Sequence, residues 1–116
     1  MEEFSRTELL IKKEGIDTLQ NSTVAIFGVG GVGGFVVEAL ARAGVGTLHI
    51  IDHDTVSVSN LNRQIIATHQ TIDQKKVEVM KERILSINPH CHVLTYDDFF
   101  LPETVDHFPF DEFDYI

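Results

Sequence analysis

The sequence lacks several features that would define whole classes of protein. Its 116 residues include one cysteine, Cys91, which excludes an internal disulfide and a cysteine-based zinc cluster. No apolar run approaches the roughly 20 residues that span a bilayer, and no signal peptide is visible at the N-terminus. These absences fit a reducing compartment, and we expect the cytoplasm.

Basic side chains are also scarce. The chain carries 9 Lys and Arg against 18 Asp and Glu, a formal net charge of −9, and residues 97–116 contain acids but no base. A nucleic-acid-binding surface needs the opposite sign. We interpret the acidic stretch as a solvated face, so any RNA substrate would have to be held by another subunit, a further segment or a local basic cluster.

The apolar pattern of the chain predicts strands that alternate with helices. Short apolar runs predict strands at 23–27, 47–51 and 92–95, with 113–116 as the approach to a fourth. Helical spacing of apolar residues predicts helices at about 32–43 and 72–88. The first of these is apolar nearly all round, so we expect it to be buried. The order implies an α/β, Rossmann-like parallel sheet built from right-handed βαβ units.

The ends of the chain differ from this central pattern. Residues 1–22 are expected to form a helical N-terminal arm, as two short pieces broken near Gly15, before a nucleotide-binding domain at 23–116. The sequence stops on what reads as the first residues of a core strand, which would leave strand edges and apolar faces uncovered. We therefore expect a domain truncated at its C-terminal end, belonging to a longer protein.

A glycine-rich turn between the first strand and the first helix is the strongest functional signal. Gly28, Gly30 and Gly33 permit a tight turn, close approach of the backbone to a phosphate, and close helix–strand packing. The helix N-terminus adds free N–H groups and partial positive charge. Asp52, 19 residues after Gly33, can accept hydrogen bonds from a ribose. The turn predicts nucleotide binding without separating ATP from a dinucleotide.

Four residues downstream favour a triphosphate. Two amides and two cations follow the acidic residue, namely Asn60, Arg63, Gln64 and Lys76. Their charge would stabilise pyrophosphate as it leaves the α-phosphorus. A nicotinamide-dependent oxidoreductase gives these residues no role, and a non-catalytic nucleotide-binding fragment is a third reading. Asp54 stays open between stabilising a turn and contacting a ligand.

Histidine and phenylalanine residues are expected to be structural, and no metal site is predicted. His90 and His92 would share one face of a strand with Cys91 on the other, and they have no further partner at ligand spacing. His49 is interpreted as a tolerated residue of the sheet. The phenylalanines of residues 99–113 are expected to pack the last loop rather than to stack RNA bases.

Several motifs in combination resemble the ubiquitin-activating-enzyme-like ThiF/MoeB/HesA adenylating family. They are Gly28-x-Gly30-Gly31-x-Gly33, Asp52-x-Asp54-x-Val56, Ser59-Asn60-Leu61-Asn62-Arg63-Gln64 and Lys76-Val77. The stretches 4–10, 63–69 and 76–81 are more similar to the branch of tRNA threonylcarbamoyladenosine dehydratases, TcdA. The resemblance implies ATP-dependent adenylation of a carboxylate, in that branch the cyclisation of threonylcarbamoyladenosine in tRNA with release of AMP. An adenylating activator of a ubiquitin-like sulfur-carrier protein is the alternative within the family.

The resemblance also implies roles for single residues. It places Gly28, Gly30, Gly31, Gly33, Asp52, Asn60 and Gln64 in nucleotide binding, and Arg63, Lys76 and Arg6 in catalysis. Arg6 matches an arginine that reaches the triphosphate of the other subunit, which implies a homodimer. The family's magnesium-binding aspartate, transfer cysteine and substrate-binding half would fall beyond Ile116. Magnesium is therefore expected for the family, with its aspartate ligand absent from this chain.

Overall fold

Three short apolar runs form a parallel sheet in the computed structural model, which describes residues 2–116. The strands β1 (Thr23–Phe27), β2 (Thr47–Ile51) and β3 (His92–Tyr96) lie in the order β1-β2-β3. The bounds of β1 and β2 agree with the prediction. β3 is one residue longer than predicted, because Tyr96 still pairs in register with Ile51.

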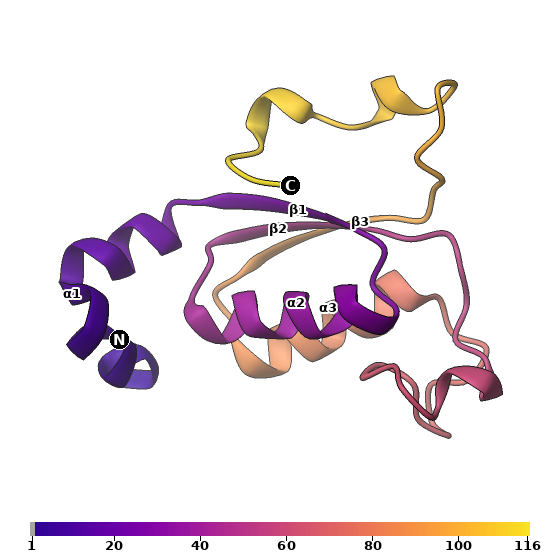
Figure 1. The fold of residues 1–116 in the computed structure, drawn as a ribbon, viewed down its shortest axis with the longest axis horizontal. Helices are drawn as coiled ribbons and strands as arrows, with labels where there is room; N and C mark the ends of the chain where they lie inside the picture. Colours follow the sequence, from indigo (N-terminus) through magenta and orange to yellow (C-terminus); the bar gives the residue numbers. More distant parts are fainter. Residues whose placement is uncertain (1) are drawn as a thin grey trace.

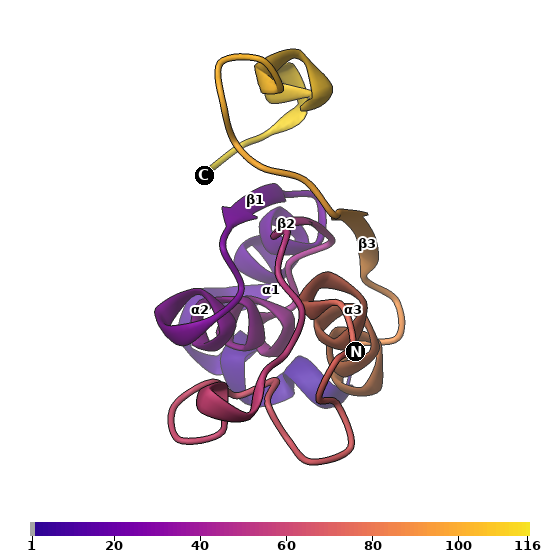
Figure 2. The same ribbon diagram turned by 90° about the vertical axis from the view of Figure 1, so that its right-hand side faces the viewer.

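Two helices connect the strands and cover the same face of the sheet (Figures 1 and 2). They are α2 (Gly31–Ala43) and α3 (Lys76–Ile87). The core between helices and sheet contains fully buried side chains such as Leu48, Met80 and Ile84. Arg83 of α3 donates a hydrogen bond to Glu38 of α2 at 2.6 Å, which links the two helices. The predicted α/β, Rossmann-like sheet is confirmed, and no helix among residues 2–116 is long and apolar enough to cross a bilayer.

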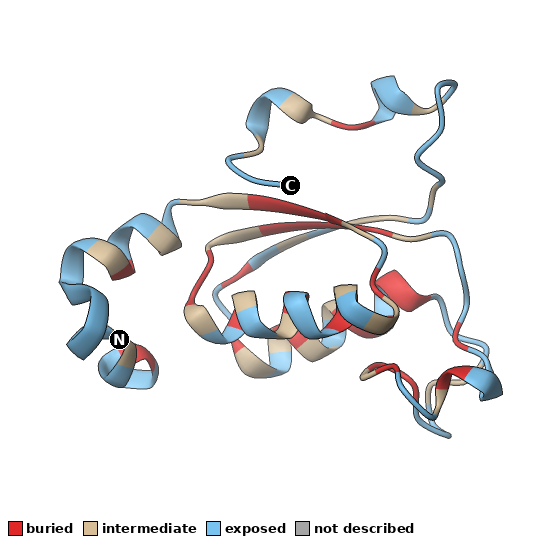
Figure 3. Cartoon of the chain, in the orientation of Figure 1, coloured by how far each residue is buried: buried red, intermediate tan, exposed pale blue. Residues whose placement is uncertain are grey.

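The prediction that α2 is buried all round was wrong. Val37 and Ala41 face the core, but Val32 is 81% exposed and Phe35 is 56% exposed. Figure 3 shows the exposed stripe along the helix. Among the helices of the described residues, α3 packs beside α2, and the side of α2 that carries Val32 and Phe35 stays exposed.

The predicted start of α3 at residue 72 was also wrong, since the helix begins at Lys76. Residues just before it pair with the segment that follows Asp52. Lys75 forms an antiparallel bridge with Thr55, and the N–H of Val56 donates to the carbonyl of Gln74 at 2.8 Å. This pairing holds Lys75 in an extended conformation, after a turn in which Asp73 has φ 72°, and delays the helix by one turn.

The N-terminal arm extends away from the sheet (Figure 1). α1 (Ser5–Gln20) contains a break at Lys12, whose φ is 65°, rather than near Gly15 as predicted. The arm contacts the rest of the chain at both ends. Phe4 is buried against Gly44, and the carbonyl of Leu19 accepts a hydrogen bond from the Gly46 N–H at 3.0 Å.

Residues 97–116 cross the opposite face of the sheet and return to the free edge of β1 (Figure 2). Phe108 is buried there against Ala25 and Ile51. Tyr115 forms a parallel bridge with Val24, and its carbonyl accepts a hydrogen bond from the Ala25 N–H at 3.0 Å. The predicted approach to a fourth strand is therefore present beside β1. In open α/β sheets, ligands bind where the strand order reverses, at the carboxyl ends of the strands.

Candidate functional site

The glycine turn follows β1 directly and folds back onto the start of α2. Gly28 has φ +93°, which favours glycine, and its N–H donates to the carbonyl of Ile51 at 2.7 Å. At Gly33 a Cβ would lie 1.8 Å from the Gly28 carbonyl oxygen, so only glycine allows this approach. The first helical hydrogen bond runs from the Gly34 N–H to the Gly30 carbonyl. The first N–H groups of α2 therefore have no acceptor within the helix.

Asp52 joins this turn to the end of β2. Its Oδ2 accepts a hydrogen bond from the Val29 N–H at 3.0 Å, and its Oδ1 accepts one from the Asp54 N–H at 2.9 Å. A carboxylate has about four lone-pair sites, so both oxygens keep capacity for a further donor. A cavity of about 280 Å³ opens here, lined by Gly28 and Asp52 among other residues.

Asn60 builds the loop that carries the next two site residues. It is buried, and its Oδ1 accepts a hydrogen bond from the Ser57 N–H at 2.8 Å. Its backbone carbonyl accepts one from the Gln64 N–H at 2.9 Å and one from the Arg63 N–H at 3.2 Å. The sequence did not reveal this structural role, although an Asn three residues after a Ser is a known side-chain capping pattern.

Gln64 and Arg63 lie at the end of this loop, and their side chains have different environments. Gln64 is buried, and its Oε1 has no hydrogen-bond partner among the described residues. Its amide lies against the glycine turn, since a Cβ on Gly30 would be 3.0 Å from Gln64 Nε2. Arg63 is exposed, and its Nη1 donates to the Ser59 carbonyl and to Asn62 Oδ1 at 3.0 and 2.9 Å. A buried amide atom without a partner calls for a ligand or water.

Lys76 is buried although it carries a charge. Its side chain is 7% exposed, and its Nζ lies 3.8 Å from Asp54 Oδ2. The other oxygen of Asp54 lies 3.0 Å from His53 Nε2. Ligand atoms of Asp52, His53 and Asp54 approach within 4.8 Å of one another, but the Lys76 ammonium already supplies positive charge there. We therefore assign this group no metal.

The structure brings the glycine turn, Asp52, Asn60, Gln64 and Lys76 to the carboxyl ends of β1 and β2. Arg6 is not among them. It is exposed on α1, which precedes β1 and lies beyond the amino end of the sheet (Figure 1). A contact between Arg6 and this site thus needs a second copy of the chain.

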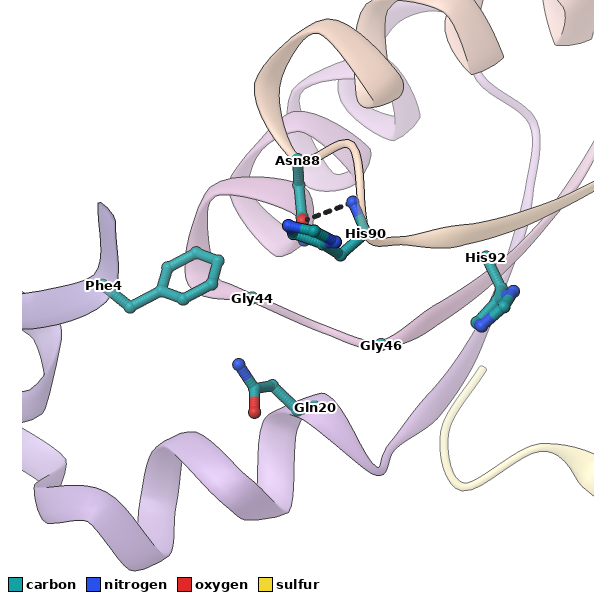
Figure 4. A pocket seen from close by; sticks show the side chains of 7 residues that line it. All are labelled: Phe4, Gln20, Gly44, Gly46, Asn88, His90 and His92. Atoms are coloured by element: carbon teal, nitrogen blue, oxygen red, sulfur yellow. Dashed lines mark hydrogen bonds between the residues drawn. The ribbon is translucent and has the colours of Figure 1, made fainter. Parts of the chain in front are cut away.

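A second cavity, also of about 280 Å³, lies at the amino ends of the strands (Figure 4). Phe4, Gln20, His90 and His92 line it, and the Asn88 side chain accepts a hydrogen bond from the His90 N–H at 3.3 Å. The neighbouring Cys91 is buried, which raises the pKa of its thiol to about 11. At neutral pH this thiol is protonated and a poor nucleophile.

His49 is a residue of the sheet, as predicted, and lies under residues 97–116. It is 3% exposed, its Nδ1 lies 2.8 Å from the Tyr96 hydroxyl, and its ring meets Phe113 edge-on. Burial lowers the pKa of His49, against an opposing effect of Glu112. Phe110 and Phe113 pack around Phe108 as predicted, and the Phe100 ring also contacts Phe108 although Phe100 is 56% exposed. Phe99 is 49% exposed and instead stacks on His53 beside Asp52.

Comparisons with known proteins agree on one family. The model of the ThiF family matches residues 4–116. The chain is 51% identical over 115 residues to tRNA threonylcarbamoyladenosine dehydratase of Bacillus subtilis, covering 99% of this chain and 44% of the relative. It is 43% identical over 107 residues to the same enzyme of Haemophilus influenzae, covering 92% and 41%.

Solved structures give the same result. The Escherichia coli enzyme TcdA in complex with ATP superimposes with a TM-score of 0.89 at 40% identity, covering 91% of this chain and 44% of that chain. The chain therefore spans less than half the length of the relatives that it matches.

Proposed function

Because the chain belongs to the ThiF family, we propose that its site binds ATP and that the protein adenylates a carboxylate. The observation that carries the proposal is the position of Lys76. This buried ammonium lies 3.8 Å from Asp54 Oδ2, and Asp54 lines the cavity at the carboxyl ends of β1 and β2 together with Gly28 and Asp52. A triphosphate offers oxygens that complete such a site.

Each part of the site has a place in this proposal. The N–H groups at the start of α2, from Gly31 to Gly33, bind phosphate, while Gly28 and Gly30 shape the turn that lets the phosphate approach, and Asp52 accepts the ribose hydroxyls. When the Gln64 amide is flipped, Nε2 takes the position of the unpartnered Oε1 and donates a hydrogen bond to a phosphate oxygen. Asn60 positions the loop, and Arg63 and Lys76 stabilise the charge of departing pyrophosphate.

We further propose cyclisation of threonylcarbamoyladenosine in tRNA as the reaction of the whole protein. Support comes from the names of the relatives and from the ATP and AMP complexes of the E. coli enzyme. The proposal includes a homodimer in which Arg6 of one copy reaches the site of the other, with residues 1–22 as the arm and 23–116 as the nucleotide-binding domain. It also includes magnesium on the triphosphate and a cytoplasmic location, where tRNA is found.

A thermal-shift experiment tests the nucleotide. ATP should raise the melting temperature, NAD should not, and Lys76→Ala or Arg63→Ala should reduce the ATP effect. A nicotinamide-dependent oxidoreductase predicts the reverse preference, which a saturable change in NADH fluorescence on titration with the protein would reveal. Release of AMP with threonylcarbamoyladenosine-containing tRNA, but not with a sulfur-carrier protein, distinguishes the two acceptors. Binding of ATP without any AMP release favours a non-catalytic module.

A further inference from the structure

Two adjacent lysines of the chain have very different ion pairs. Lys75 is exposed and lies 2.8 Å from Asp97 Oδ2, a direct hydrogen-bonded pair, and the pKa of Lys75 is raised by that bond. Lys76 is nine-tenths buried and lies 3.8 Å from Asp54 Oδ2, beyond hydrogen-bond distance. The more buried ammonium thus has the looser partner.

The backbone keeps Asp54 and Lys76 together. The Lys76 N–H donates to the Asp54 carbonyl at 3.0 Å, and the neighbouring Thr55–Lys75 bridge fixes the same two segments. The Asp54 side chain is 54% exposed and sits at the mouth of the cavity that Asp52 and Gly28 also line. Its carboxylate can therefore turn away from Lys76 without any movement of the backbone.

A buried charge is costly unless it is paired and hydrogen-bonded. An anion that brings its oxygens within hydrogen-bond distance of Lys76 Nζ would satisfy the ammonium better than Asp54 does at 3.8 Å. The carboxylate and such an anion would compete for the same ammonium.

We propose that Asp54 is a positioning residue that holds the Lys76 ammonium in the nucleotide-free protein and yields it to the nucleotide phosphates. The inference rests on the proposed function, because it takes a triphosphate as the competing anion. Asp54 then stabilises the empty site and weakens nucleotide binding. A residue that only stabilised the turn would, on removal, weaken both the fold and the binding.

The test uses Asp54→Asn in the full chain, with ATP and tripolyphosphate as ligands in calorimetric titrations. The variant should bind both ligands about fivefold more tightly, the upper end for one half-exposed ion pair, while its melting temperature without ligand falls. Asp97→Asn is the matched control, since it removes the partner of Lys75 outside the cavity. The control should change the affinity by less than twofold.

A double-mutant cycle separates the proposal from general charge repulsion. In a Lys76→Met background, Asp54→Asn should no longer tighten binding, and its effect on the melting temperature should shrink. Asp54→Ser repeats the cycle without an amide that could itself bind lysine. Weaker binding by Asp54→Asn, or equal tightening in both backgrounds, would overturn the proposal. If the wild-type chain binds neither ligand, the proposed function fails, while the melting-temperature cycle still decides whether Asp54 holds Lys76.

Discussion

Replacing Gly33 by alanine tests whether the glycine turn is held as closely against α2 as the structure indicates. The new Cβ would lie 1.8 Å from the Gly28 carbonyl oxygen and 2.8 Å from its carbonyl carbon. Neither atom belongs to a flexible side chain, so the backbone of the turn or of the helix has to move. A shift of the turn would stretch or break the 2.7 Å hydrogen bond from the Gly28 N–H to the Ile51 carbonyl.

We expect Gly33→Ala to lower the free energy of unfolding by about 3 kcal/mol, the upper end for overpacked sites. In a domain of this size that corresponds to a melting temperature lower by roughly 10 °C. The assay is urea unfolding followed by circular dichroism, with a thermal scan in parallel. ATP binding should be lost with the geometry of the turn.

Gly31→Ala is the matched control. A Cβ there meets nothing within 4 Å, and the residue begins α2. Alanine should therefore leave the stability unchanged or raise it by up to about 1 kcal/mol. If Gly33→Ala and Gly31→Ala unfold at the same urea concentration, the close approach of the turn to α2 is refuted.

Three further predictions concern single side chains. Arg63→Ala should weaken ATP binding about tenfold, the effect of one charge-assisted hydrogen bond, with little change in melting temperature because the side chain is exposed. An unchanged affinity in calorimetry would show that Arg63 does not belong to the site. Burial in the folded state lowers the pKa of His49, so His49 binds fewer protons in the folded than in the unfolded protein, and stability should fall as the pH drops below about 6.5. Urea unfolding between pH 5 and 8 should show this slope in the wild type and a flatter one in His49→Gln. Ile84→Ala, at a fully buried position, should cost about 2–5 kcal/mol, and a loss below 1 kcal/mol would show that α3 does not pack on the sheet as described.

Local patterns predicted the strands well, because apolar and β-branched runs pair wherever the sheet forms. The predicted start of α3 was wrong for a non-local reason. Residues 72–75 have helical spacing, but Asp73 has φ 72° in a turn, and Lys75 pairs with Thr55 in an extended conformation. The prediction that α2 is buried was wrong at Phe35 for a similar reason. Burial depends on which elements pack around α2, and the sequence of α2 alone does not contain that information.

The candidate site also combines features that the local sequence predicts with features that depend on the folded structure. Glycine spacing and Asp52 place the turn correctly, because both depend on short-range backbone geometry. The burial of Lys76 and its loose pairing with Asp54 arise from the folding of the loop, and no spacing rule reveals them. The sequence thus predicts which residues form the candidate site, and the fold shows how these residues are buried and paired.

We propose that a triphosphate binds between the glycine turn and Lys76. Amide chemical shifts of the isotope-labelled chain, followed by NMR during titration with ATP, test this most directly. We predict saturable shifts at residues 28–34, at Asp52 and at Lys76, with none around His90 and His92 in the cavity at the other end of the sheet. Shifts confined to that second cavity, or no saturable shifts at all, would show that the triphosphate does not bind at the glycine turn.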